Sequence, residues 1–371
     1  MKKWQKMGVG IAFWISALSA AQAQILVGQT AGFTGQVAAG VKETTDGALL
    51  YIDAVNAKGG VNGQKIELTS LDDKFDPKLA ADNARKLIEE QNVSALFLTR
   101  GTPHTEAIIP LLEKHGVALV GPSTGAMVLH QPVRKYIFNV RATYQREAEK
   151  AMTHLASMGI TRIALMYADD SFGADGVAGA QKGLAAAKLT PVVLEKFDRA
   201  KPDFAPIVAK IATADAQAVL MVASGSAVVD AGAALRAAGS GAQIVTLSNN
   251  ASGGFIKSLG PNARGVIVTQ VYPNERAVTY AMVKEAQELA KAKGLSEITP
   301  AMLEGFAAAK VLVEGLKRAG PKPSRDKIHA ALESIRKFDL GGLEVSYAAD
   351  DHTGLDFADL SIIGTDGKFR R

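Results

Sequence analysis

Short apolar runs alternate with longer stretches of helical spacing along most of the 371-residue chain. This alternation is typical of βαβ units, which build a mostly parallel sheet. A first series of β-type segments spans residues 25–29, 65–73, 93–99 and 117–122. A second series follows residue 144 and spans 162–168, 191–197, 216–223 and 243–248. Two series of the same kind predict an α/β protein with two sheets of similar design.

The segments between the strands show the apolar spacing of helices. The first of them ends at Gly59 and Gly60, which suit the left-handed positions at a helix end. Further helices are predicted over 77–91 and 103–115, and the Ala- and Gly-rich stretch 174–188 indicates a close-packed helix. One face of the first helix is expected to carry Val41, Ala48, Leu49, Ile52 and Val55.

The last third of the chain follows a different pattern. Three helical stretches, 277–293, 300–319 and 324–337, precede two short β-type segments, and Asp366-Gly367 suits a hairpin turn. Helices with so few strands cannot build their own sheet, so we expect them to return to the first series. A chain of this length also exceeds the roughly 250–300 residues that one core supports. The predicted lobes are 24–142 plus 273–346, and 143–272 plus 347–371.

The N-terminus has the pattern of a secretory signal peptide. Lys2, Lys3 and Lys6 precede an apolar run, and the small residues Ala21–Ala23 form a cleavage site before Gln24. The apolar run is shorter than the roughly 20 residues of a spanning helix, although an uncleaved N-terminal anchor is the alternative interpretation. We therefore expect residues 1–23 to be removed on export.

Charge and cysteine content exclude several classes of function. Without residues 1–23 the net charge falls from +5 to +2, because three lysines and no acidic residue are lost. The basic residues are scattered and only 6% of residues are aromatic, so no nucleic-acid partner is expected. The absence of cysteine excludes disulfides, thiolate chemistry and a lipoprotein anchor. Export without disulfides favours a bacterial periplasm.

The loop 99–107 carries candidate binding chemistry. Thr102 before Pro103 predicts an N-cap with proline at the first helical position. A helix N-terminus attracts a carboxylate or phosphate, and in open α/β sheets ligands bind beyond the carboxyl ends of the strands. Arg100 is placed either to clamp the anion or to face solvent. Plain helix capping is the alternative role of Thr102.

The next loop matches the hydrolase pattern G-x-S-x-G at Gly121, Ser123 and Gly125. Pro122 and the lack of an upstream oxyanion-hole segment count against a nucleophilic serine, so Ser123 and Thr124 are interpreted as cleft-lining or turn residues. The glycines at 28, 32 and 35 do not have dinucleotide-binding spacing, and the six histidines are scattered. We expect no cofactor and no metal.

Four segments, 51–77, 101–126, 167–176 and 354–369, together resemble the periplasmic binding proteins of branched-chain-amino-acid-type ABC transporters. The strings "NAKGGVNGQKIEL" and "DDKFDP" carry most of this resemblance, which extends over the whole mature chain. It implies two Rossmann-like lobes joined by three hinge crossings, no enzymatic activity, and an inner-membrane permease with ATPase subunits as partners. A ligand-sensing receptor of the same fold and a secreted serine hydrolase are the alternatives.

The resemblance also implies a ligand site. A hydroxyl at Thr102 binds the ligand carboxylate, the loop Ser123–Gly125 adds backbone contacts, and Phe172 covers the ligand from the second lobe. Asn249 stands where leucine/isoleucine/valine-binding members have a glutamate for the ligand ammonium group, and Arg100 replaces an apolar contact. Since an unpaired buried ammonium is costly, these departures favour an acid without an α-amino group over leucine.

Overall fold

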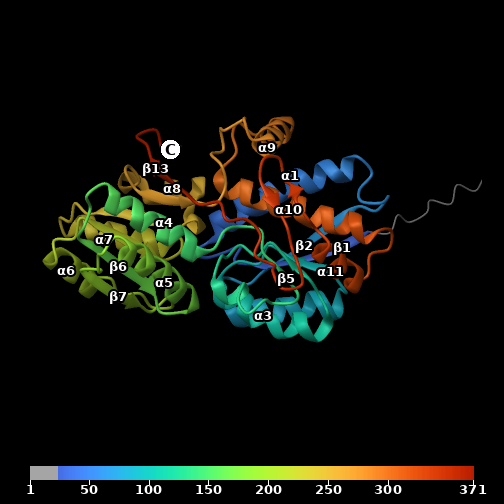
Figure 1. Ribbon diagram of the computed structural model, residues 1–371, viewed down its shortest axis with the longest axis horizontal. Helices are drawn as coiled ribbons and strands as arrows, with labels where there is room; N and C mark the ends of the chain where they lie inside the picture. The colour runs from blue at the N-terminus through green and yellow to red at the C-terminus, as the bar shows by residue number, and fades with distance from the viewer. Residues whose placement is uncertain (1–23) are drawn as a thin grey trace, which may run out of the picture.

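The computed structural model describes residues 24–371, so the predicted signal peptide lies outside the described residues. Two mostly parallel sheets, each covered by helices, form two lobes side by side (Figure 1). We call the part around the five-stranded sheet lobe 1 and the part around the seven-stranded sheet lobe 2. The prediction of an α/β protein with two sheets is confirmed.

Lobe 1 has an entirely parallel sheet with the order β2-β1-β3-β4-β5. Its strands are β1 (Ile25–Ala31), β2 (Ile66–Asp72), β3 (Ala95–Phe97), β4 (Leu119–Val120) and β5 (Ile137–Phe138). The helices that follow these strands in sequence are α1 (Ala38–Ala57), α2 (Pro77–Arg85) with a π-helical end (Lys86–Glu90), and α3 (Thr102–His115). Apolar residues such as Val27, Phe97 and Val120 are fully buried between the layers.

Lobe 2 has the strand order β14-β13-β10-β9-β8-β6-β7, in which β13 runs antiparallel to both of its neighbours, β10 and β14. Its strands are β6 (Ile163–Ala168), β7 (Val193–Phe197), β8 (Ala218–Val222), β9 (Gln243–Thr246), β10 (Ile267–Gln270), β13 (Asp359–Ile363) and β14 (Phe369–Arg370). Its helices are α4 (Tyr144–Ser157), α5 (Ser171–Ala186), α6 (Ala205–Thr213), α7 (Ser226–Ala237) and α8 (Gly253–Leu259). Asp366-Gly367 lies in the β13–β14 connection, as the sequence predicts.

The chain passes between the lobes three times, after β5, after β10 and before β13. After the second passage it forms α9 (Ala281–Ala292), α10 (Pro300–Ala319), α11 (Arg325–Glu333) and a small hairpin of β11 (Phe338–Asp339) and β12 (Glu344–Val345). These helices lie with α1 on lobe 1 in Figure 1, which confirms that the last third returns to the first series.

Glycines let helices approach closely at two interfaces. A Cβ on Gly305 of α10 would lie 1.7 Å from the Thr44 carbonyl oxygen of α1, so this crossing requires glycine. A Cβ on Gly179 of α5 would lie 2.4 Å from the Cα of Gln145 in α4. The Ala- and Gly-rich stretch is therefore a close-packed helix, as predicted.

Two local predictions are wrong. In α1, Leu50 is buried and Leu49 only partly buried, because the helix packs on α10 and Leu50 shares a core cluster with residues of the sheet. In α3, Thr102 is the first helical residue and Gly101, with φ of 95°, is the N-cap. The hydroxyl of Thr102 does not cap the helix, since it bonds to another side chain.

A buried ion-pair network lies where the first and second passages meet the lobes. Arg141, 1% exposed, pairs with Glu147 of α4 and donates to the Ser248 hydroxyl at 2.6 Å. Glu147 also accepts from the Ser248 backbone N–H at 2.9 Å and from the Thr269 hydroxyl. Glu304 of α10 lies 3.6 Å from the Arg141 guanidinium. These charges tie the hinge region to both lobes.

Candidate functional site

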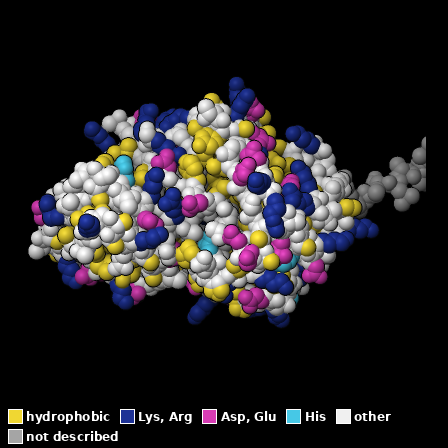
Figure 2. Space-filling view, viewed as in Figure 1, with side chains coloured by type: hydrophobic (Ala, Val, Ile, Leu, Met, Phe, Trp, Pro, Cys, Tyr) yellow, Lys and Arg dark blue, Asp and Glu magenta, His cyan; other side chains and the backbone are white. Residues whose placement is uncertain are grey.

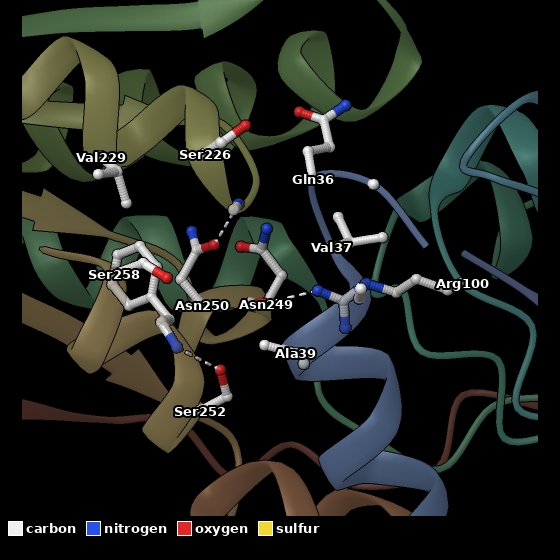
Figure 3. Close-up of a pocket in the computed structure, with 15 residues that line it drawn as sticks. Gln36, Val37, Ala39, Arg100, Ser226, Val229, Asn249, Asn250, Ser252 and Ser258 are labelled. Carbon is white, nitrogen blue, oxygen red and sulfur yellow. Dashed lines mark hydrogen bonds between the residues drawn. The ribbon is translucent and has the colours of Figure 1, made fainter. Parts of the chain in front are cut away.

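A pocket of about 320 Å³ lies between the N-terminus of α1 in lobe 1 and the loops after β8 and β9 in lobe 2 (Figure 3). Parallel strands end at one edge of each sheet, so these loops meet across the gap between the lobes. Its lining consists of Gly35, Gln36, Val37, Ala38, Ala39, Gly40, Arg100, Gly225, Ser226, Val229, Asn249, Asn250, Ser252, Phe255 and Ser258. This position and size suit a small organic ligand.

Arg100 is the one charged residue among those that line this pocket. It follows β3, is 5% exposed, and donates from Nη1 to the Ser123 hydroxyl at 3.0 Å and from Nη2 to the Asn249 carbonyl at 2.6 Å. Among the described residues no carboxylate forms an ion pair with it. Burial lowers the pKa of Arg100, because desolvation penalises its charged form. The pocket therefore holds a buried cation with no carboxylate at ion-pair distance, and the Glu304 carboxylate acts on it only from further away.

Lobe 2 supplies asparagines and serines to the pocket. Asn249 donates from Nδ2 to the Ala223 carbonyl at 3.1 Å and to the Ser224 hydroxyl at 2.9 Å, and its Oδ1 is buried without a partner. Asn250 Oδ1 accepts from the Gly225 backbone N–H at 2.8 Å, which fixes the loop after β8. These side chains offer hydrogen bonds and no charge.

Of the sequence-predicted site residues, the structure brings Arg100, Ser123 and Asn249 together. Thr102 and Thr124 are buried and their hydroxyls lie 2.7 Å apart, hydrogen-bonded to each other. None of Thr102, Ser123 and Thr124 is a lining residue of the pocket itself. Ser123 does line a smaller cavity on the lobe 1 side of Arg100.

Gly125 and Phe172 lie beside the first hinge passage. The Gly125 carbonyl accepts from the Tyr144 backbone N–H at 2.8 Å, and a Cβ on Gly125 would lie 2.5 Å from the Ala142 carbonyl oxygen. The Phe172 ring is 4.9 Å from that of Tyr144 in an edge-on contact, and Arg199 lies 5.6 Å from its centre. Neither residue lines the pocket.

Within residues 24–371, no histidine or carboxylate is hydrogen-bonded to the Ser123 hydroxyl. This hydroxyl accepts a hydrogen bond from Arg100, whose guanidinium cannot take up a proton. A nucleophilic serine needs a histidine or equivalent base within hydrogen-bond reach. The G-x-S-x-G spacing therefore forms a buried loop without hydrolase geometry.

Direct contacts join the lobes around the pocket. Glu43 of α1 accepts from the backbone N–H groups of Gly253 and Gly254 in α8, at 2.9 and 2.8 Å. The Ala301 backbone N–H of α10 donates to the Ala251 carbonyl of lobe 2 at 3.0 Å. The two lobes are therefore closed against each other in this structure.

Several residues that line the pocket are not among the sequence-predicted site residues: residues 35–40 on the α1 side, and Ser226, Asn250, Ser252 and Phe255 in lobe 2. The sequence-predicted residues lie mainly in the loops after β3 and β4, where ligands are expected beyond the carboxyl ends of strands. The same rule applied to the loops after β1, β8 and β9 indicates these residues.

Within residues 24–371, no group of three or more His, Asp or Glu side chains could hold a metal ion, and no helix is long and apolar enough to cross a membrane. Lysines, arginines and acidic residues are interspersed over the face shown in Figure 2. This face therefore shows no extended basic surface of the kind that binds nucleic acid.

Comparison with known proteins gives consistent matches. A family model described as periplasmic binding protein matches residues 24–358. The "Leu/Ile/Val-binding protein homolog 3" of Brucella melitensis is 26% identical over 216 residues, 57% of each chain, so this chain spans just over half the length of that curated relative. A substrate-binding periplasmic protein from Ralstonia solanacearum is 31% identical with a TM-score of 0.86, over 93% of this chain and 99% of that one. A possible leucine/isoleucine/valine-binding protein from Rhodopirellula baltica is 25% identical with a TM-score of 0.87, over 95% and 98%.

Proposed function

Because this chain belongs to the periplasmic binding protein family, we propose that it captures a small carboxylate-bearing ligand and delivers it to an ABC importer. The family is one of solute-binding proteins and not of enzymes. Several relatives are named as Leu/Ile/Val-binding or amino acid binding proteins, which supports a ligand of amino-acid size. The proposed partners are an inner-membrane permease and its ATPase subunits, and the proposed location is the periplasm, reached through cleavage before Gln24.

The unpaired guanidinium of Arg100 is the observation that carries the carboxylate assignment. Removing a cation from water costs several kcal/mol unless an anion and good hydrogen bonds compensate. Two of its nitrogen atoms bond to neutral oxygens, those of Ser123 and Asn249. A ligand carboxylate in the pocket would supply the missing charge through a charge-assisted hydrogen bond.

The remaining predicted residues would lie behind the pocket lining, in a layer that supports the proposed site. Thr102 and Thr124 contact the carboxylate only if they exchange their mutual hydrogen bond for one to the ligand. Ser123 and Gly125 would hold the loop 121–125 in place. Phe172, which lies in lobe 2, would cover this supporting layer. Asn249 would contact the ligand from the opposite lobe.

Capture would proceed by hinge closure between lobes with the boundaries 24–142 plus 273–346 and 143–272 plus 347–371. The three chain passages between the sheets support this mechanism, since a few loop residues can absorb a domain rotation. The cross-lobe contacts of Glu43 and Ala301 would then form when the ligand is enclosed.

Isothermal titration calorimetry of residues 24–371 against carboxylic acids and their primary amides tests this function. We expect acids to bind and amides of the same skeleton to bind at least tenfold more weakly. Arg100→Gln should remove most of that preference, whereas Arg264→Gln, an exposed arginine with no ion pair, should leave it unchanged. Equal affinities for acids and amides in the unsubstituted protein would contradict the proposal.

A further inference from the structure

We infer that this pocket selects organic acids with an apolar middle and an uncharged polar outer end. These acids carry no ammonium group beside the carboxylate. The inference rests on the proposed function and specifies its ligand class. It makes Arg100 the residue that sets the charge of the ligand, and Gln36 and Ser226 the residues that meet the outer end.

The charge of the pocket is the first step. Its fifteen lining residues include one arginine and no aspartate or glutamate. The carboxylate one turn further along α1, Glu43, already accepts hydrogen bonds from Gly253, Gly254 and the Thr299 hydroxyl. Asn249, which faces Arg100 from lobe 2, is neutral. No lining group therefore balances an ammonium ion.

An α-ammonium group would also lie close to Arg100, because it is attached one carbon away from the carboxylate that the guanidinium attracts. Like charges in a poorly solvated site repel each other, and a buried ammonium without a counter-charge is costly. An acid without the amine meets neither penalty. We expect the two to differ by roughly 100-fold or more in affinity, since leaving a buried charged group unpaired costs at least that much binding.

The burial gradient of the lining defines the rest of the ligand. Val37 and Phe255 are 4% and 5% exposed, and with Val229 they form an apolar middle. Gln36 is half-buried and Ser226 exposed, and neither side chain has a hydrogen-bond partner in the structure. Figure 3 shows both side chains on the same side of the pocket, away from Arg100. They are free to bond a hydroxyl or carbonyl group of the ligand.

Calorimetry with four ligands tests this class: 3-phenylpropionate, 3-(4-hydroxyphenyl)propionate, phenylalanine and tyrosine. These ligands vary the α-ammonium group and the ring hydroxyl independently. The pair 4-methylpentanoate and leucine repeats the amine comparison on an aliphatic skeleton. We expect each acid to bind roughly 100-fold more tightly than its amino acid, because the unpaired ammonium group penalises the amino acid. The ring hydroxyl should strengthen binding by roughly fivefold, a typical effect of one hydrogen bond.

Variants assign these effects to residues. Asn249→Asp should weaken acids and narrow the gap to the amino acids, whereas Asn249→Ala, which adds no charge, should not narrow it. Ser226→Ala combined with Gln36→Ala should remove the advantage of the hydroxyl, so that 3-phenylpropionate and 3-(4-hydroxyphenyl)propionate bind the double variant with equal affinity. Circular dichroism and thermal unfolding would show that each variant is folded. If Asn249→Asp does not fold, Arg100→Leu replaces it, because that variant should also abolish the preference for acids over their amino acids.

The outcomes separate the two proposals. Amino acids that bind as tightly as their deaminated acids would overturn the inference and leave carboxylate capture intact. A hydroxyl effect that survives the double variant would overturn the outer-end assignment. The proposed function fails as well if the unsubstituted protein binds no acid of either skeleton and Arg100→Leu does not alter the affinity for these acids.

Discussion

Substitution of Gly254 by alanine should disfavour closure of the lobes without disturbing either lobe. Gly254 lies in the first turn of α8, and an added Cβ would lie 2.4 Å from the Cβ of Ala39 in α1. Ordinary carbon contacts need at least about 3.5 Å, so the lobes would have to separate by roughly 1 Å. That separation would also lengthen the hydrogen bonds from Gly253 and Gly254 to Glu43, now 2.9 and 2.8 Å.

The expected cost falls on the closed state, since the Cβ meets nothing from lobe 2 in its three nearest contacts. Overpacking costs about 1–3 kcal/mol, which corresponds to a loss of ligand affinity of roughly 5- to 150-fold. Calorimetry with the best acid measures this loss, and small-angle X-ray scattering with saturating ligand should show a more open molecule. Gly241→Ala is the matched control, because a Cβ there meets no atom within 4 Å. Unchanged affinity in Gly254→Ala would refute the assignment of this interface to the ligand-bound state.

Three further predictions concern stability. Arg141→Met should lower the unfolding free energy by about 3–5 kcal/mol in urea titrations, because Glu147 would remain buried and charged without its partner. Gly305→Ala should cost at least about 2 kcal/mol in the same assay, since its Cβ would lie 1.7 Å from the Thr44 carbonyl oxygen. Burial lowers the pKa of His104 to about 4, so the unfolded chain takes up a proton first as pH falls below about 6.5. Relative to His104→Phe, the unsubstituted protein should therefore lose about 2 kcal/mol between pH 7.5 and 5, and equal losses would contradict this assignment.

The order of strands and helices was predictable because local signals specify it. Alternating β-type and helical spacing, Gly59-Gly60 at the end of α1 and Asp366-Gly367 before β14 all act within a few residues. The return of the last three helices to lobe 1 was predictable because the strands near them are too few to build a separate sheet. These arguments need no knowledge of long-range contacts.

The site was harder to predict because its chemistry depends on side chains far apart in the sequence. Arg100 meets the Asn249 carbonyl across 149 positions, and a single sequence contains no sign of that contact. Thr102 has the residue type of an N-cap, yet Gly101 takes the cap position and the Thr102 hydroxyl bonds to Thr124. Local propensity gave Thr102 the wrong role because a tertiary partner competes for its hydroxyl.

The position of Arg100 links recognition to closure. Its guanidinium reaches from lobe 1 to the Asn249 carbonyl of lobe 2 and is 5% exposed in this closed arrangement, so in the proposed mechanism closure would desolvate it. Closure without an anion therefore buries an uncompensated cation, which opposes the closed state. A bound carboxylate would remove that penalty and would bind the closed form more tightly than the open one, which is the condition for a ligand to shift the equilibrium. A neutral solute of the same shape gains the apolar contacts and leaves the penalty in place. Pairing of the Arg100 guanidinium with a ligand anion, more than the fit of the rest of the ligand, would then determine which solutes close the lobes.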